Sequence, residues 1–460
     1  GSVTNNAALA FNRSDAISAA NVISGTGSVT QAGSGTTTLT AANSYSGGTT
    51  LAAGILLAGD NAAFGSGAVT IASNGVTLGT TADRTLTNAI DLANNATFDT
   101  GSNAVTLSGV ISGAGSLEKA GSDTLTLAGA NTYSGGTTIS AGTLAVSQLA
   151  DSGPSNLGPS GTLALAGGTL EYTAAGNATT ARLVDISAAN TTSTINVSDA
   201  AATLTLTNNV RNSDPSHPNV VLTKAGGGTL EIGGAGGNTG TSLVAAAGTT
   251  LLNATARAVY EIRALDTGAT VRLAQANQAF NGDAISTTGN IRMTGGTLDL
   301  DGNAQEISRL IGSDNATAGT GTITSSSPAT FTFGNNLAGR PSLFDGSITG
   351  DVAVVTRGTN PITLGGASSY TGTTTVGGSR LSVNGSLGNT AVTVTAGILG
   401  GTGSIAGTVA VQSGGTLAPG NSIGVLTEGA TSFASGATFA YEVDSTNLNS
   451  LGTAADLLVV

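Results

Sequence analysis

The pattern most suggestive of chemistry in this sequence is the run GNSIG at 420–424. It matches the G-x-S-x-G pattern around the nucleophilic serine of many hydrolases, which stands on a strand-to-helix turn beside a histidine base. His217, the only histidine, lies about two hundred residues earlier in a proline-rich stretch. Pro419 suits the start of a turn. We therefore interpret 420–424 as a turn and predict no nucleophile at Ser422.

Two aspartates, Asp299 and Asp301, alternate with leucine at the end of a strand-like run. Alternate strand residues lie on one face about 6–7 Å apart, and paired carboxylates can serve an inverting glycosidase or bind Ca²⁺. Arg292 is the nearest basic residue, and Gly302 comes too early for an EF-hand loop. We favour a solvated strand end before the turn at Gly302-Asn303, with carboxylate chemistry as the alternative.

Composition narrows the possible functions. The chain has 460 residues, of which 70 are glycine, and only 9% are charged, against roughly 25% in a typical globular domain. Because 39% are hydrophobic, the chain has enough to bury, unlike a disordered segment. The net charge of −12, with lysines and arginines scattered singly, argues against nucleic acid and anionic membranes as partners. The absence of cysteine excludes disulfides and thiolate metal sites.

Internal repetition is the strongest signal in the chain. Residues 22–56 and 110–144 align without gaps, 88 residues apart, and eroded copies begin at Val220 and Ala353. Such repetition along the whole length indicates an array of similar structural units.

Two repeat positions carry residues that could contact ligands: a lysine position (Gln31, Lys119, Lys224 and Arg357) and a tyrosine position (Tyr45, Tyr133 and Tyr370). We predict that the lysines cap a turn, with the ammonium group in water. The tyrosines could stack on sugars, but they lie too far apart in sequence to form one platform. We predict that they pack at corners on a neighbouring coil.

The local pattern is that of short strands. In the run TLTL at 124–127, apolar residues alternate with threonine, as in a half-buried strand. An antiparallel sandwich or barrel and a solenoid of parallel strands both fit. We favour the solenoid because the repetition is continuous, the inward positions are small or medium aliphatics, and outward Thr, Ser and Asn would form ladders. Roughly 20–25 residues per coil predict about twenty coils, a rod on the order of 100 Å long.

Three segments interrupt the pattern. The stretches 150–161 and 209–220 hold four of the eight prolines, so we predict loops that leave the solenoid. In the charged stretch 255–266, Arg257 and Glu261 have the i,i+4 spacing of a short helix, although a strand is equally allowed. We expect binding specificity to lie in these three segments.

Three runs resemble the autotransporter-associated β-strand repeats of type V secreted passenger domains: GAGSLEKAGSDTLTLAG (113–129), ANTYSGGTTISAGTL (130–144) and GILGGTGSIAGTVAVQSGGTLAPGNSIGVL (397–426). The resemblance extends over essentially the whole chain and is densest at 22–144 and 353–425. It implies a right-handed parallel β-helix that is exported through an outer-membrane barrel and acts as an adhesin or surface scaffold. In this family the run PGNS-x-G is a coil turn. Since strands of such a barrel are missing, we expect a fragment of a longer protein.

We accordingly predict one continuous β-helix over 1–460 that is extracellular or on the outer cell surface, with no catalytic, cofactor or metal site. The expected function is adhesion or surface scaffolding, with a host or neighbouring-cell receptor or a polysaccharide as partner. A self-assembling extracellular fibre is one alternative, because few charges and uncovered β edges favour stacking. A polysaccharide-active enzyme is a second, disfavoured by the scarcity of His, Lys and Trp.

Overall fold

The computed structural model describes residues 1–152, 155–186, 192–213, 220–235, 241–278, 289–313, 316–336, 339–443 and 455–460. Within these residues the chain forms fifty β-strands and no helix. The strands pair in parallel with their counterparts in the next coil, giving a parallel β-solenoid of about 19 turns. The predicted all-β solenoid of about twenty coils is confirmed.

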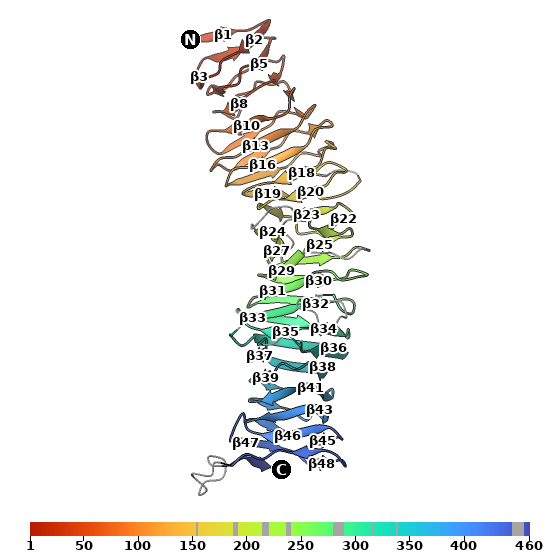
Figure 1. Cartoon of the computed structure of the whole chain (residues 1–460). Coiled ribbons are helices and arrows are strands. Elements are labelled where there is room, and N and C mark those ends of the chain that lie inside the picture. The colour runs from red at the N-terminus through yellow and green to blue at the C-terminus, as the bar shows by residue number, and fades with distance from the viewer. Residues whose placement is uncertain are drawn as a thin grey trace. The chain divides into compact units, whose positions relative to one another are not determined.

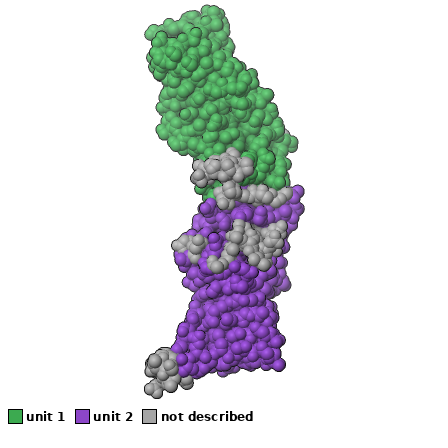
Figure 2. Space-filling model, viewed as in Figure 1, with its two compact units in different colours: residues 1–230 green, residues 231–460 purple. Residues whose placement is uncertain are grey.

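The chain divides into two compact units, residues 1–230 and 231–460 (Figure 2). In each unit the strands stack in successive layers (Figure 1). That one continuous β-solenoid runs from residue 1 to residue 460 stays a prediction.

In unit 1 each coil has three sides. The strands β12 (Ile90–Asp91), β13 (Ala96–Asp99) and β14 (Val105–Leu107) pair in turn with β15 (Ile111–Ser112), β16 (Leu117–Ala120) and β17 (Thr124–Leu127). Paired residues on these coils are 20 or 21 positions apart, as Val105 and Leu125 or Ile90 and Ile111 are. The predicted coil length is confirmed here at its lower end.

The first side of unit 1 is a six-stranded sheet, and the second is a ten-stranded sheet. The six-stranded sheet contains β12 and β15 together with β2 (Ala8–Phe11), β5 (Ser28–Gln31), β7 (Thr49–Leu51) and β9 (Val69–Ile71). The ten-stranded sheet contains β13 and β16 together with β3 (Ile17–Ala19), β6 (Thr36–Leu39), β8 (Ile55–Ala58), β10 (Val76–Thr80), β18 (Thr137–Ile139), β20 (Leu163–Leu165), β23 (Val184–Ile186) and β26 (Val210–Arg211).

The third side begins at β11 and becomes more extensive in the later coils. It contains β14 and β17 together with β11 (Arg84–Leu86), β19 (Thr143–Val146), β21 (Thr169–Tyr172), β24 (Thr192–Val197) and β27 (Val220–Ala225). The strands β22 (Ala178–Thr180), β25 (Thr203–Leu206) and β28 (Thr229–Ile232) join the same sheet but pair with one another in a separate ladder. A separate pair, β1 (Ser2–Thr4) and β4 (Val22–Ser24), completes the strands of this half.

Unit 2 has the same parallel stacking, with several longer, bent strands. A five-stranded sheet contains β40 (Ala367–Ser368), β42 (Ser386–Leu387), β44 (Ser404–Ile405), β47 (Val425–Glu428) and β50 (Leu457–Val459). The remaining strands are β29 (Thr241–Ala245), β30 (Gly248–Leu252), β31 (Glu261–Leu265), β32 (Ala269–Leu273), β33 (Asn290–Asp299), β34 (Gln305–Ile307), β35 (Arg309–Ile311), β36 (Thr320–Phe333), β37 (Ser342–Phe344), β38 (Ser347–Thr356), β39 (Ile362–Leu364), β41 (Thr374–Val383), β43 (Val392–Gly401), β45 (Val409–Val411), β46 (Gly415–Pro419), β48 (Thr431–Phe433) and β49 (Thr438–Phe439).

The strand alternation places one set of side chains inside every coil. In β17, Leu125 and Leu127 are each 1% exposed, whereas Thr124 and Thr126 lie half-buried on the outer face. Because side chains alternate across a strand, the run TLTL defines both the core and the surface of this side.

The repeated tyrosines lie inside the coils. Each is at most 1% exposed, and each hydroxyl bonds the hydroxyl of the threonine four residues later. The pairs are Tyr45–Thr49 (2.7 Å), Tyr133–Thr137 (2.7 Å) and Tyr370–Thr374 (2.6 Å). The predicted packing role is confirmed, and these rings are not available to stack on sugars.

The repeated lysines also lie inside, which corrects the expectation of an ammonium group in water. Lys119 and Lys224 are both 0% exposed. The Lys119 ammonium donates to the carbonyls of Ala120 (2.6 Å) and Gly121 (2.9 Å), and Lys224 bonds its own turn in the same way. The predicted turn-capping role is right, but the predicted solvation is wrong, because oxygens from neighbouring coils enclose the Lys119 amine as well.

Equivalent repeat positions fall on successive sides of unit 1. Gln31 ends β5 in the six-stranded sheet, Lys119 lies in β16 in the ten-stranded sheet, and Lys224 lies in β27 on the third side. In the first copy a neutral side chain bonds the carbonyls of the turn. Gln31 donates to the carbonyl of Gly33 at 2.7 Å and accepts from the Thr37 hydroxyl at 2.5 Å. A buried polar group at this position therefore ties a turn of the coil, whatever its charge.

The register of β17 gives a first prediction. Leu127→Asp should lower the free energy of unfolding by about 3 kcal/mol or more, because it replaces a core side chain with a buried carboxylate. Thr126→Asp should change it by less than about 1 kcal/mol, because the side chain faces water. Urea melts and limited proteolysis measure both, and equal effects would mean that the inward and outward faces are reversed.

The buried lysine gives a second prediction, about pH. Burial lowers the pKa of Lys119 from 10.5 to about 8. Between these two values the unfolded chain binds more protons than the folded chain, so this group makes the free energy of unfolding rise with pH through that window. Lys119→Gln should remove this contribution. Urea melts of wild type and variant at pH 7.5 and pH 10 give the four free energies of unfolding, and wild type should gain more stability between the two pH values than the variant.

The first copy supplies the matched rescue. Leu125 stands where Thr37 bonds Gln31, so Lys119→Gln alone leaves the amide oxygen facing a leucine and should cost about 1–3 kcal/mol. Leu125→Thr alone should also be destabilising, because it truncates a core leucine, but together the two changes rebuild the Gln31–Thr37 pair, so a double-mutant cycle should show a favourable coupling energy of about 1 kcal/mol. If the changes in the free energy of unfolding are strictly additive, positions 119 and 125 do not interact as Gln31 and Thr37 do.

Candidate functional site

The G-x-S-x-G run is a turn, as predicted. Residues 421–423 form a bend between β46 and β47, and Gly420 has a φ of +82°. The Ser422 hydroxyl lies 3.4 Å from Oε2 of Glu442. No helix follows it within the described residues, so the strand–turn–helix elbow that this motif needs is lacking there. His217 lies outside the described residues.

The two aspartates of the carboxylate hypothesis do not face a shared site. Oδ2 of Asp299 pairs with the Arg272 guanidinium at 2.8 Å, and Oδ1 accepts the backbone N–H of Asp301 at 3.0 Å. Asp301 lies in the following turn with a φ of +48°. Asp299 does end β33, so the strand-end position is confirmed, but its side chain is only 14% exposed and is paired with arginine, so the predicted solvation is wrong for Asp299. Arg272 comes from the coil before and was not predicted, because it lies 27 residues away in sequence.

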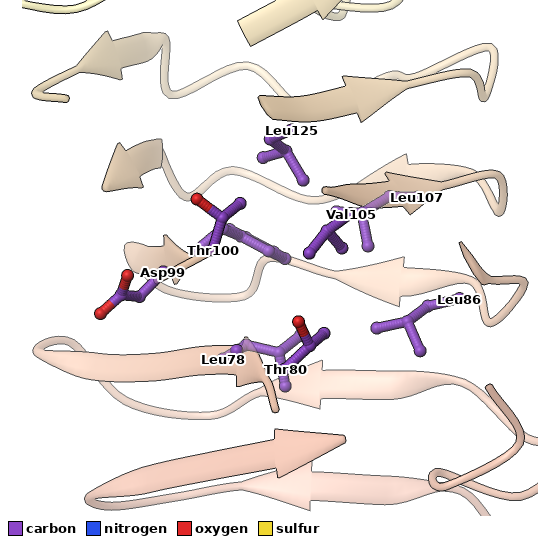
Figure 3. A pocket seen from close by; sticks show the side chains of 10 residues that line it. Leu78, Thr80, Leu86, Asp99, Thr100, Val105, Leu107 and Leu125 are labelled. Carbon is purple, nitrogen blue, oxygen red and sulfur yellow. The ribbon is translucent and has the colours of Figure 1, made fainter. Parts of the chain in front are cut away.

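One interior cavity, in unit 1, is too small for a ligand larger than water. This cavity of about 10 Å³ is lined by apolar side chains such as Leu78, Leu86 and Leu107, with the Thr80 hydroxyl (Figure 3). This is about the space of one water molecule. Across the described residues, no cluster of three or more acidic or histidine side chains could hold a metal ion, and none of the described elements is a helix able to cross a membrane.

In the charged stretch 255–266, residues 255–260 are bends and irregular chain, and only Glu261–Leu265 form a strand, β31. The Arg257 guanidinium lies over the Tyr260 ring, 5.2 Å from its centre. The strand alternative is right for β31 only, because Val259 lies outside that strand and is buried. In the stretch 209–220, Arg211 pairs with Asp185 at 3.3 Å, and residues 214–219 lie outside the described residues.

The stretch 150–161 contains an insertion in the repeat. In the first copy, Asn43 donates its amide to the carbonyl of Ala63, which follows that copy, at 2.7 Å. In the second, Asn131 donates to the carbonyl of Asn156 at 2.6 Å. Asn43 and Asn131 are 88 residues apart, whereas their partners are 93 apart, so the second copy carries five additional residues.

These additional residues lie in 147–154, which stands where the first copy has Gly-Asp-Asn at 59–61; we call 147–154 the inserted segment. Ser155, Asn156 and Leu157 are at most 1% exposed and continue the coil. The prediction that all of 150–161 leaves the solenoid is therefore wrong for 155–158. Prolines marked the region, but the pairing with Asn131 decides which part of it is coil.

Asp151 and Arg182 anchor the inserted segment. The Asp151 carboxylate accepts the Thr180 hydroxyl at 2.7 Å and the Ala181 N–H. The Arg182 guanidinium donates to the carbonyls of Gly158 and Ser160. Its side chain is 3% exposed, and its Nε lies 3.8 Å from the Asp151 carboxylate, too far for a hydrogen bond.

Two hollows flank this anchor. One of about 370 Å³ is lined by residues 147–150, Tyr172 and residues 177–179. The other, of about 360 Å³, is lined by Asp151, residues 159–162 and residues 181–183. Both hollows are broadly open to solvent rather than enclosed. Residues 147–151 of the inserted segment thus form part of the walls of two surface hollows, and residues 153–154 lie outside the described residues.

The comparisons with known proteins agree with this architecture. The passenger-associated-transport-repeat family model matches residues 29–58, 117–146 and 357–383, and the first two matches are 88 residues apart, as the sequence repeat is. The adhesin BmaC autotransporter of Brucella suis biovar 1 (strain 1330) is 39% identical over 240 residues. That alignment covers 47% of this chain and 7% of the relative. No solved structure matches.

The matched repeats are segments of the coils described above. The first spans β5 to β8, and the second spans β16 to β19. The chain thus carries passenger-associated-transport repeats in three places and is similar over about half of its length to an autotransporter adhesin.

Proposed function

We propose that this passenger acts as a non-enzymatic adhesin exposed on the bacterial surface, and that it contacts its target through the inserted segment and the two hollows beside it. The observation that carries the proposal is the five-residue insertion at a position where the first copy has a tight turn. The name of the similar Brucella protein, an adhesin, supports it.

The physics of a solenoid supports this location. Inward side chains are committed to the core and to turn ties, and outward threonines recur on successive coils. A repetitive face offers the same contacts at many positions, so selective contacts are expected where the chain departs from the repeat. Extra residues in such a place cost little, because loop-closure entropy grows slowly with length.

The other chemical candidates support a non-enzymatic role. Arg272 occupies one oxygen of Asp299, and Ser422 lies in an exposed bend against a glutamate. The geometry of neither residue is that of a poised catalytic group.

The chain supplies its own template for the test. Replacing residues 147–154 with Gly-Asp-Asn, the turn of the first copy, should leave the circular dichroism spectrum nearly unchanged and lower the melting temperature, because the buried Arg182 loses the counter-charge of Asp151. Attachment of the purified chain to cultured epithelial cells should fall at least tenfold, because the walls of both hollows are removed.

Thr126→Asp is the control, since it changes an outer shaft position without touching the hollows, and it should attach like wild type. Full attachment by the replaced chain would contradict the proposal. Loss of attachment in Thr126→Asp, with full attachment by the replaced chain, would favour the fibre alternative, in which the shaft faces associate.

A further inference from the structure

A neutral residue performs the structural task of Arg182 in the preceding copy. Asn88 donates its amide to the carbonyls of Gly65 and Gly67. Arg182 donates to the carbonyls of Gly158, the counterpart of Gly65, and of Ser160. The surrounding runs NAIDL (88–92) and RLVDI (182–186) align. Satisfying these carbonyls therefore does not require a charge.

The arginine is a costly group at this place. It is 5% exposed, and burial lowers the pKa of its guanidinium despite the opposing charge of Asp151. Its Nε is buried and has no hydrogen-bond partner among the described residues. A buried cation with an unused donor is expected to destabilise the fold unless another group completes its bonding.

That unused donor belongs to a side chain that lines the hollow of about 360 Å³. Asp151 lines the same hollow with a carboxylate whose side chain is 37% exposed, and Ser160 and Thr162 add two hydroxyl-bearing side chains. The charges of Asp151 and Arg182 balance. The hollow therefore presents charge-assisted donors and acceptors with no net charge, which favours a hydroxyl-rich neutral ligand over an ion.

We propose that the hollow between Asp151 and Arg182 binds a neutral saccharide unit, with the Asp151 carboxylate accepting from sugar hydroxyls, the buried charge of Arg182 holding that carboxylate in position, and the Ser160 and Thr162 side chains completing the contacts. This inference rests on the proposed function and names the ligand class of the same surface. The second hollow offers Gln148, Asn177 and Thr179. It would receive the next sugar of a linear chain.

The test uses the purified 460-residue chain and calorimetric titration with four probes: cellohexaose, maltohexaose, chitohexaose and hexagalacturonate. At least one neutral hexasaccharide should bind. Asp151→Asn and Arg182→Asn should each weaken that binding at least tenfold, since the first removes the charged acceptor and the second installs the residue of the preceding copy. Arg272→Asn is the matched control, because it breaks an exposed arginine–aspartate pair elsewhere, and it should bind like wild type.

Asp151→Asn keeps the test decisive if Arg182→Asn does not fold, and circular dichroism identifies that case. Absence of binding by all three neutral probes would overturn the saccharide assignment, as would binding of hexagalacturonate alone or equal binding by wild type and Asp151→Asn. If the segment replacement abolishes cell attachment while no neutral probe binds, the adhesin proposal stands and the ligand class falls. If a neutral probe binds but attachment survives the replacement, the sugar site stands and the adhesin proposal falls.

Discussion

Parallel hydrogen bonding between successive coils is the constraint on which the rest of this structure depends. Each strand must pair with the strand on the same side of the preceding coil. This requirement sets the spacing of 20 or 21 residues between paired positions of β12 and β15 or of β14 and β17. The ladder leaves only two places for a side chain, inside a narrow core or outside in water. Any polar group that falls inside must then find its partners within the turn or in the next coil. The Tyr–Thr pairs and the buried lysine ties satisfy this requirement.

The sequence predicted what depends on local alternation and on repetition. The TLTL run at 124–127 indicated which leucines are buried, and the offset of 88 residues revealed the array. The sequence did not predict the burial of Lys119, because two of the oxygens around its amine belong to Thr100 and Ala141, about one coil away on either side. The ion pair between Asp299 and Arg272 was not predicted for the same reason. In a solenoid, neighbours in space are a coil apart in sequence, and the length of that coil has to be known before side chains can be paired.

The candidate site shows the same division. Prolines in 150–161 indicated that the pattern breaks there, but proline frequency cannot separate a projecting segment from one that rejoins the coil. The signal that would have separated them is present: Asn-Leu-Gly at 156–158 corresponds to Ala-Phe-Gly at 63–65, once the five additional residues are allowed for. Arg182 was overlooked because its counterpart Asn88 shares neither its charge nor its size, only its position and its carbonyl partners.

A repeat position that accepts different chemistry shows what the fold itself requires. At the turn tie, glutamine and lysine both serve, because each bonds the carbonyls of its turn. In the fourth copy, Arg357 instead pairs at the surface with Glu306 at 2.9 Å. Where this repeat position is buried, the fold therefore requires that the turn carbonyls be hydrogen-bonded, and the charge of the side chain is free to vary. Where charge appears beside a hollow, as at Asp151 and Arg182, the carbonyls alone do not account for it, and its role must be sought in what reaches that surface.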